Sequence, residues 1–215
     1  MADRAAVFID GNNWYHGLRD RLKLPRLLEL DYAAISKKLL GPREWTCSRY
    51  YVGQVQQRGR TSLYTDQRRF LRRLIDADIR ISYHLGRLEP RTVTNEAARE
   101  LRNYLTESRA SCDPRVFRDL MALAARHLKV TVMVEKAVDV HLAVDMVMMA
   151  EWDEYDVAYL LSADGDFTPA VKAVRGMGKK IFAASPLYGA RLAAVVNSYI
   201  RLNSAWFTDC YRPIR

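Results

Sequence analysis

The chain has 215 residues, of which 49% are hydrophobic and 27% charged, the balance of a globular protein of one domain rather than of a disordered chain. No apolar run approaches the length needed to cross a bilayer, and the apolar stretch near the N-terminus has no cleavage-site pattern, so we expect neither a membrane protein nor a signal peptide. The formal net charge of +9 favours a polyanionic partner, usually nucleic acid. Three widely spaced cysteines without metal-ligand spacing indicate a reducing compartment, and we expect the cytoplasm.

Strands and helices alternate through the first 86 residues. Runs of β-branched and aromatic residues predict strands at 5–9, 46–52 and 78–85. Helical spacing of apolar residues predicts helices at 14–22, 32–40 and 61–76. Asn12 or Asn13 is expected to cap the first of these helices, and Asp31 the second.

The pattern changes after Gly86. Residues 87–128 are polar and charged, with helices expected at 95–107 and from Pro114 to about 127. The apolar content of this segment is too low for a core of its own. We therefore expect one domain over residues 1–215 that carries a helical insertion at 87–128.

The alternation resumes in the last 85 residues. Strands are predicted at 130–134, 157–161 and 180–184, and helices at 139–151, 168–176 and 189–198. Several of these strands are apolar on both faces, as strands covered by helices on both sides are. The sequence therefore predicts an α/β fold with a doubly wound, mostly parallel sheet and helices on both faces.

Carboxylates follow two of these strands directly. Asp10 ends the run Val-Phe-Ile, Gly11 lets the backbone turn, and Asn13 adds an amide for a metal-bound water or a phosphate. Ser162 ends a later strand, and Asp164 and Asp166 then flank a glycine at a helix start. The structural alternatives are an Asx turn at Asp10 and a solvated turn at the other two.

A third acidic segment lies at residues 135–145. Residues 140–150 are apolar nearly all round, as in a buried helix, yet they include Asp145, whose burial requires a partner or a metal. His141, one helical turn earlier, is the structural alternative as that partner. Asp139 is either a further site acid or only a helix cap, and Lys136 is placed to hold a carboxylate or a phosphate.

These acids are expected to meet, because the carboxyl ends of parallel strands open onto one edge of a sheet, where ligands bind. Converging carboxylates repel one another unless a cation neutralises them, and hard divalent ions prefer oxygen ligands. The sequence therefore predicts a site for Mg²⁺ or Mn²⁺ at this edge.

The motifs FIDGNN, KAVDVHLAVD and SADGDF, in this order, resemble those of the NYN family of PIN-like nucleases, and within it the LabA-like group. The resemblance implies a PIN-like sheet and metal-dependent cleavage of RNA, with Asp10, Asp139, Asp164 and Asp166 as the acidic, metal-binding site. It implies Asp145 as a further acid, and Asn13 and Ser162 as supporting groups. The sequence departs from the family at Ala137 and Ala163, where glycine is common, which concerns backbone shape rather than ligands.

A basic stretch is the candidate RNA-binding element. Its arginines can follow a phosphate backbone, or they can form a solvated helix face: Arg58, Arg60, Arg68, Arg69, Arg72 and Arg73. Trp14 and Tyr15 follow the first acidic loop and can stack on a base, although core packing is favoured.

The sequence as a whole predicts a metal-dependent ribonuclease acting on single-stranded RNA. Two alternatives stay open. One is a non-catalytic module of the same fold that binds RNA or protein, and the other is a metal-dependent phosphohydrolase acting on small phosphoesters. The basic stretch favours RNA over small esters. A homodimer is compatible with the sequence, and no membrane partner is expected.

Overall fold

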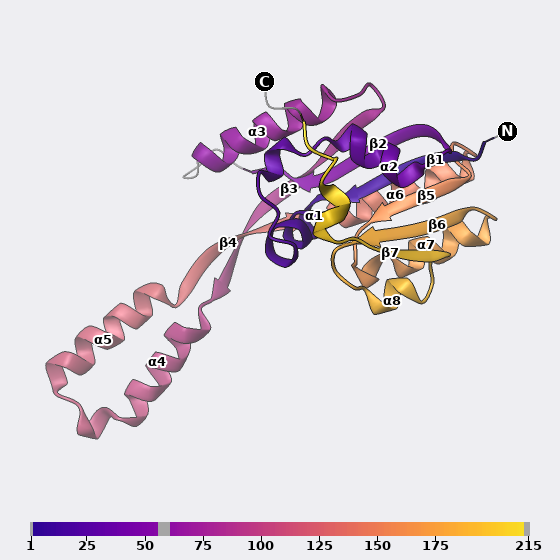
Figure 1. Cartoon of the computed structure of the whole chain (residues 1–215). Coiled ribbons are helices and arrows are strands. Elements are labelled where there is room, and N and C mark those ends of the chain that lie inside the picture. Colours follow the sequence, from indigo (N-terminus) through magenta and orange to yellow (C-terminus); the bar gives the residue numbers. More distant parts are fainter. Residues whose placement is uncertain (1, 56–60, 213–215) are drawn as a thin grey trace. The chain divides into compact units, whose positions relative to one another are not determined.

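The computed structural model describes residues 2–55 and 61–212, apart from the side chains of Thr61, Leu88 and residues 133–136. Within these residues, seven strands form one sheet in the order β4-β3-β2-β1-β5-β6-β7 (Figure 1). Along the sheet, neighbouring strands are parallel in the run β3-β2-β1-β5-β6-β7. The predicted doubly wound, mostly parallel sheet is confirmed.

The strands cover the predicted positions and add one more. Their bounds are Arg4–Asp10 (β1), Glu44–Gly53 (β2), Ile81–Thr94 (β3), Lys129–Lys136 (β4), Val157–Leu161 (β5), Lys180–Ser185 (β6) and Ser198–Arg201 (β7). The predicted helix at 189–198 is wrong, because only a four-residue helix forms there and β7 follows it. Asn197 fixes β7 beside β6, since its backbone N–H donates to Ile181 O and its side-chain Oδ1 accepts from Ile181 N, both at 2.8 Å. This pairing across the sheet is not visible in the local pattern.

Apart from the last, the helices form close to the predicted positions, but not all of them begin at the predicted cap. Their bounds are Gly11–His16 (α1), Tyr32–Leu40 (α2), Thr61–Ile75 (α3), Glu96–Glu107 (α4), Pro114–His127 (α5), Val138–Glu151 (α6), Thr168–Gly176 (α7) and Ala190–Ala193 (α8). Asp31 caps α2 as predicted, accepting from the N–H groups of Ala33 and Ala34. The predicted cap of the first helix is wrong: Asp10 caps it, so α1 begins at Gly11, and a π-helical turn continues it from Gly17 to Arg21.

Helices cover both faces of the sheet, and β1 shows why. Its alternate residues Ala5, Val7 and Ile9 lie in one core with residues of α1, α2 and α3, whereas Ala6 and Phe8 lie in a second core with residues of α6 and α7. Successive side chains of a strand point to opposite faces, so a run that is apolar throughout belongs to a strand buried on both sides.

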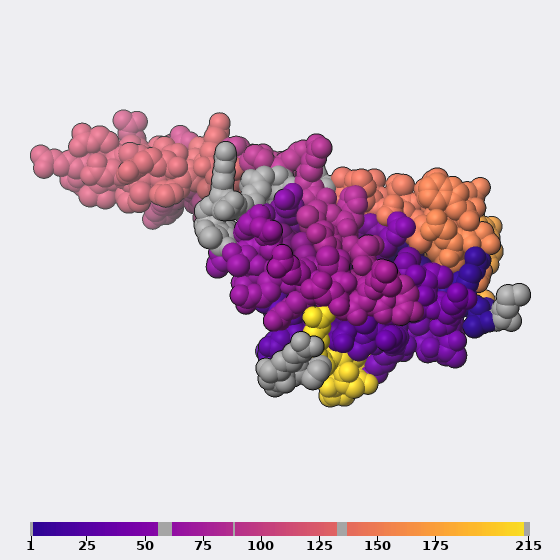
Figure 2. Space-filling view, turned by 90° about the horizontal axis from the view of Figure 1, so that it is seen from above, coloured from indigo at the N-terminus to yellow at the C-terminus, as the bar shows by residue number. Residues whose placement is uncertain are grey.

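The chain after β7 packs against the α2 side of the sheet. Phe207 contacts Trp14, with ring centroids 5.9 Å apart, and Lys38 Nζ donates to Trp206 O at 2.7 Å. Figure 2 shows this segment in yellow beside the indigo and purple residues of the N-terminal half. These contacts place Trp14 in the core rather than at a ligand.

The chain divides into two compact units, residues 1–87 with 136–215 and residues 88–135. In the second unit, α4 and α5 pack together through buried residues such as Ala98, Leu105 and Ala124. Asn95 caps α4, Asp113 caps α5, and Pro114 lies in the first turn of α5 as predicted. No helix among the described residues is long and apolar enough to cross a membrane.

Candidate active site

The carboxyl ends of β1 and β5 form the point where the strand order reverses. From β1 the sheet grows through β2 and β3 in one direction and through β5, β6 and β7 in the other. Ile9 is in register with Leu161, so Asp10 and Ser162 follow at the same edge in neighbouring strands. Ligands of open α/β sheets bind in the crevice at such a reversal.

Asp10 is the buried acid of this edge, with 3% of its surface exposed. Its Oδ1 accepts from the backbone N–H of Asn13 at 3.2 Å, and its Oδ2 accepts from the hydroxyl of Ser162 at 2.8 Å. A carboxylate offers about four acceptor positions, so each oxygen keeps one for a ligand. Asp10 is thus held in one orientation with acceptor capacity to spare.

A relay of hydrogen bonds connects Asp10 to the loop after β5. Ser162 Oγ accepts from the backbone N–H of Asp164 at 3.0 Å, and Asn13 Oδ1 accepts from the N–H of Ala163 at 3.0 Å. Asp164 Oδ1 in turn accepts from the N–H of Asp166 at 2.9 Å and caps a short 3₁₀ turn, Gly165–Phe167. Asn13 and Ser162 therefore support the loop as well as Asp10.

Two glycines allow close packing of the backbone around the site. A Cβ on Gly11 would lie 2.5 Å from Tyr50 Cε1 and 2.6 Å from Tyr51 O, so this glycine is required by close packing on β2, and not by the backbone turn we expected. A Cβ on Gly189 would lie 2.1 Å from Ala163 O. The segment before α8 therefore packs directly against the acidic loop.

Asp139 lies in the first turn of α6 and is not its cap, which corrects one of the two roles expected for it. The cap position is Ala137, in the left-handed region with φ of 67° and without a side-chain hydrogen bond to the helix. Left-handed backbone favours glycine, which explains why the related motif often has glycine there. The side chain of Lys136 lies outside the described residues.

The charges of neighbouring acids contribute to raised pKa values at Asp10 and Asp139. Burial raises the pKa of Asp10 to about 6, helped by the charges of Asp139 and Asp164 and opposed by the hydrogen bonds from Ser162 and Asn13. The pKa of Asp139 is raised by burial and then by the charges of Asp164 and Asp166. This mutual repulsion is what a bound cation would relieve. Among the described side chains, however, no three Asp, Glu, His or Cys residues are grouped closely enough to hold a metal ion.

Asp145 has partners on β2 and not on its own helix. Its Oδ2 accepts from Arg49 Nη1 at 2.9 Å and from the Tyr51 hydroxyl at 2.7 Å. His141 instead stacks on His84, with ring centroids 4.2 Å apart. The structural alternative for Asp145 was correct in kind, a paired carboxylate, but it named the wrong partner.

Helix α6 is also less buried than its composition predicted. Val140, Val144 and Met148 are 63%, 51% and 37% exposed, whereas Leu142 and Met146 are fully buried. Only one side of the helix faces the sheet, so an all-apolar pattern overstated its burial.

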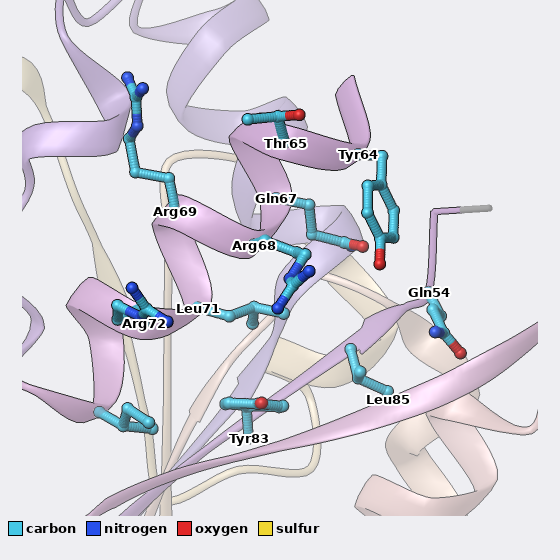
Figure 3. Close-up of a pocket in the computed structure, with 11 residues that line it drawn as sticks. Gln54, Tyr64, Thr65, Gln67, Arg68, Arg69, Leu71, Arg72, Tyr83 and Leu85 are labelled. Carbon is cyan, nitrogen blue, oxygen red and sulfur yellow. The ribbon is translucent and has the colours of Figure 1, made fainter. Parts of the chain in front are cut away.

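The basic stretch contributes to a groove of about 870 Å³ between α3 and β3. We call it the arginine groove, and its lining includes Gln54, Tyr64, Arg68, Arg69, Arg72 and Tyr83. Figure 3 shows Arg68 reaching into it between the helix and Tyr83, and Arg69 extending away. Arg68 also lies over the Tyr64 ring, 5.8 Å from its centroid.

Of the other predicted arginines, only Arg73 lies among the described residues, and it does not line this groove. Arg73 donates from Nη1 to Leu28 O at 3.3 Å, on a different side of α3. Arg58 and Arg60 lie outside the described residues. The aromatic lining by Tyr64 and Tyr83 was missed by the sequence analysis, although both tyrosines flank the basic residues and alternation with aromatics was a usable signal.

The family model of the NYN domain matches residues 74–203, which is more than half of the chain. The chain belongs to the NYN domain family. The match includes the second and third acidic motifs and begins after the first. Asp10 of the first motif nevertheless lies at the same edge of the sheet as Ser162 of the third. NYN domains have a nuclease-like fold.

A solved structure is similar over nearly the whole chain. It is the crystal structure of a protein of unknown function from Vibrio parahaemolyticus, 16% identical, with a TM-score of 0.58 and 94% of each chain covered. This likeness supports the fold alone. No curated protein matches the sequence significantly.

Proposed function

We propose that this NYN domain is a metal-dependent ribonuclease that hydrolyses phosphodiester bonds of single-stranded RNA. The observation that carries the proposal is the state of Asp10. It is buried at the strand-order reversal and fixed through both oxygens, and its burial, together with the charges of Asp139 and Asp164, raises its pKa to about 6. A structural Asx turn would not need to bury its carboxylate beside other acids.

The chemistry of the donor atoms suits a hard divalent cation. The donor set is all oxygen, which suits Mg²⁺ or Mn²⁺, and the carboxylates destabilise one another until a cation binds. Asp10, Asp139, Asp164 and Asp166 would hold it. When bound, such an ion activates water and offsets charge on phosphoryl oxygens.

The chain's own polar groups would position the reactants. Ser162 and Asn13 keep Asp10 and the loop after β5 in one arrangement. Arg68 and Arg72 in the arginine groove would bind the phosphate backbone of the strand, and Tyr83 gives the groove an aromatic surface.

Cleavage of a labelled single-stranded RNA with Mn²⁺, Mg²⁺ or EDTA tests the proposal directly. We expect metal-dependent cleavage that Asp139→Asn abolishes, because the change removes one of the proposed ligands. Asp139 is only partly buried, so the change should not disturb folding. Asp78→Asn is the matched control, since Asp78 precedes β3 and so lies at the opposite edge of the sheet. Hydrolysis of a small chromogenic phosphate ester instead of RNA would indicate a phosphohydrolase.

A second candidate is an RNA-binding module without catalysis. It is favoured by one observation, that the described acidic side chains are not grouped as a ready-made metal site. RNA binding without cleavage at any tested concentration of Mn²⁺ or Mg²⁺ would support it over the ribonuclease.

The arginine groove is tested by the salt dependence of RNA binding. Replacing Arg68, Arg69 and Arg72 by Gln should flatten the plot of log affinity against log salt by about 1.4 units, since Arg68 and Arg72 provide two contacts and each contact with single strands contributes about 0.7. Arg73→Gln is the control within α3 and should leave the slope nearly unchanged. Equal slopes for the triple variant and wild type would show that the groove does not bind the backbone.

The proposal also includes the subgroup, the domain organisation and the cellular compartment of the protein. We place the chain in the LabA-like group on its three motifs, and we regard residues 1–215 as one NYN domain into which the unit at 88–135 is inserted. Its three cysteines, free in the structure, support a reducing compartment such as the cytoplasm.

A further inference from the structure

A second cavity lies beside the first acidic loop, on the other side of α3 from the arginine groove. Its volume is about 310 Å³, at the lower end for ligand pockets. We call it the aromatic cavity and define it by Asn12, Tyr15, Tyr50, Leu63, Asp66 and Phe70. None of these residues belongs to the acidic site described above.

The cavity walls are aromatic and rigid. Tyr32, Tyr50 and Phe70 contact one another edge to face, with centroid separations of 5.2 to 5.6 Å. Around the opening, Tyr15 and Leu63 are 41% and 48% exposed, although both are large apolar groups. Exposed apolar residues gathered around a hollow, rather than scattered, indicate a binding surface.

The cavity adjoins the loop that follows Asp10. Gly11 and Asn12, the two residues after Asp10, line it, and Gly11 packs directly on the Tyr50 ring. Gln67 lines both this cavity and the arginine groove. A strand whose phosphates follow the arginines can therefore place a base in the cavity beside Asp10.

Asp66 is the one carboxylate among the described residues that line the cavity. Asp66 lines it, and among the described residues its carboxylate has no hydrogen-bond or ion-pair partner. The other polar α3 side chain that lines the cavity already has partners: Gln67 accepts from Val55 N at 2.8 Å and donates to Gly53 O at 2.7 Å. An ionised carboxylate only accepts hydrogen bonds, so it selects a ligand edge that carries N–H donors.

We propose that the aromatic cavity binds one unstacked nucleobase of the RNA strand, with guanine preferred. Aromatic walls stack on a base, and the adjacent N1–H and N2–H groups of guanine match the two oxygens of Asp66. The inference rests on the proposed ribonuclease function for its place in the reaction. The binding itself requires neither a metal ion nor cleavage.

Mononucleotide binding measured by calorimetry in EDTA tests the cavity apart from catalysis. Guanosine 5′-monophosphate should bind more tightly than adenosine 5′-monophosphate, and ribose 5-phosphate should bind least. Leu63→Trp, which fills the opening, should weaken guanosine monophosphate binding about tenfold or more, the effect of losing one stacked base. Ile79→Trp is the matched control, because Ile79 is 99% exposed and does not line the cavity.

Asp66→Asn tests the edge without changing the shape of the cavity. It should reduce the preference for guanosine over adenosine monophosphate about fivefold or more, since an amide can pair with adenine. Asp76→Asn, just beyond α3, is its control. Equal binding of ribose 5-phosphate and guanosine monophosphate, or unchanged binding by both Leu63→Trp and Asp66→Asn, would overturn the inference.

The two proposals fail in different ways. If wild type binds guanosine monophosphate and Asp139→Asn binds it equally, the cavity stands even where no RNA is cleaved. If RNA is cleaved but both cavity variants cleave guanine-rich and adenine-rich strands as wild type does, the ribonuclease stands and the cavity inference is wrong.

Discussion

Asp10→Asn is expected to stabilise the metal-free protein at neutral pH while destroying its activity. Raising the pKa from 3.8 to about 6 means that the ionised carboxylate costs the folded state about 3 kcal/mol, at 1.36 kcal/mol per pKa unit. An amide carries no charge, keeps an acceptor for Asn13 N–H and is close in size to the carboxylate. The amide NH₂ group at the other position cannot accept a hydrogen bond from the Ser162 hydroxyl, and the loss of this bond reduces the gain in stability by about 1 kcal/mol.

The net gain is therefore about 2 kcal/mol near pH 7.5, or roughly 4–8 °C in Tm for a chain of this size. The gain should shrink with acid, because a group whose pKa is raised on folding takes up its proton in the folded state first. The energetic cost of the ionised Asp10 in folded wild type is therefore lost progressively as the pH falls from above 6 towards 4. By pH 5 about half of the penalty is already gone.

Urea denaturation in EDTA at pH 5.0, 6.0 and 7.5 measures this difference. Subtracting wild type from the variant cancels the contributions of the four histidines and of other carboxylates with lowered pKa values, such as Asp78. Asp31→Asn is the control, because Asn caps a helix about as well as Asp. A variant less stable than wild type at pH 7.5, or a difference that does not change with pH, would refute the electrostatic account of Asp10.

Three further substitutions test the loop and its supports. Asp164→Asn should abolish metal-dependent cleavage and leave the stability in urea equal or slightly higher. The change removes one charge from a group of acids that repel one another, and it keeps the acceptor for Asp166 N–H. A clearly less stable variant would show that the role of Asp164 is structural. Ala137→Gly should raise the free energy of unfolding by about 0.5–1 kcal/mol by relieving left-handed strain, and a loss of stability would contradict this. Gly189→Ala should lower the free energy of unfolding by at least about 2 kcal/mol, because the added Cβ would meet the backbone of Ala163. Gly176→Ala is the control and should not destabilise the protein, because the space around Gly176 is open. Equal melting temperatures for the two variants would show that the loop moves to accept the added Cβ.

The sequence was sufficient for the parts of the fold that depend on local chemistry. The strand Val157–Leu161 was predicted to the residue, since an uninterrupted apolar run is bounded by polar residues. The cap of α2 by Asp31 and the start of α5 at Pro114 follow from neighbours in sequence. The convergence of Asp10 and the loop after β5 on one edge follows from parallel topology.

Features that depend on register across the sheet were beyond the sequence. Asp145 pairs with Arg49 and Tyr51 because β2 lies next to β1 under α6, and helical spacing alone points to His141 instead. The short strand β7 forms because Asn197 meets Ile181 on β6. In both cases a partner far away in the chain outweighs the local pattern.

The position of Arg73 shows how helical geometry separates the two surfaces of α3. Residues 66, 70 and 73 are three or four apart and so lie along one side of the helix, and Arg68 and Arg72, which are four apart, lie along another. Asp66 and Phe70 line the aromatic cavity and Arg73 reaches Leu28 beside it, whereas the second set lines the arginine groove. Gln67 fixes this division, because its amide bonds to Gly53 and Val55 and so sets the rotation of α3 against the end of β2. One helix can therefore present cations to a phosphate backbone and aromatic walls to a base, and this arrangement, more than the number of arginines, favours RNA over a small phosphoester.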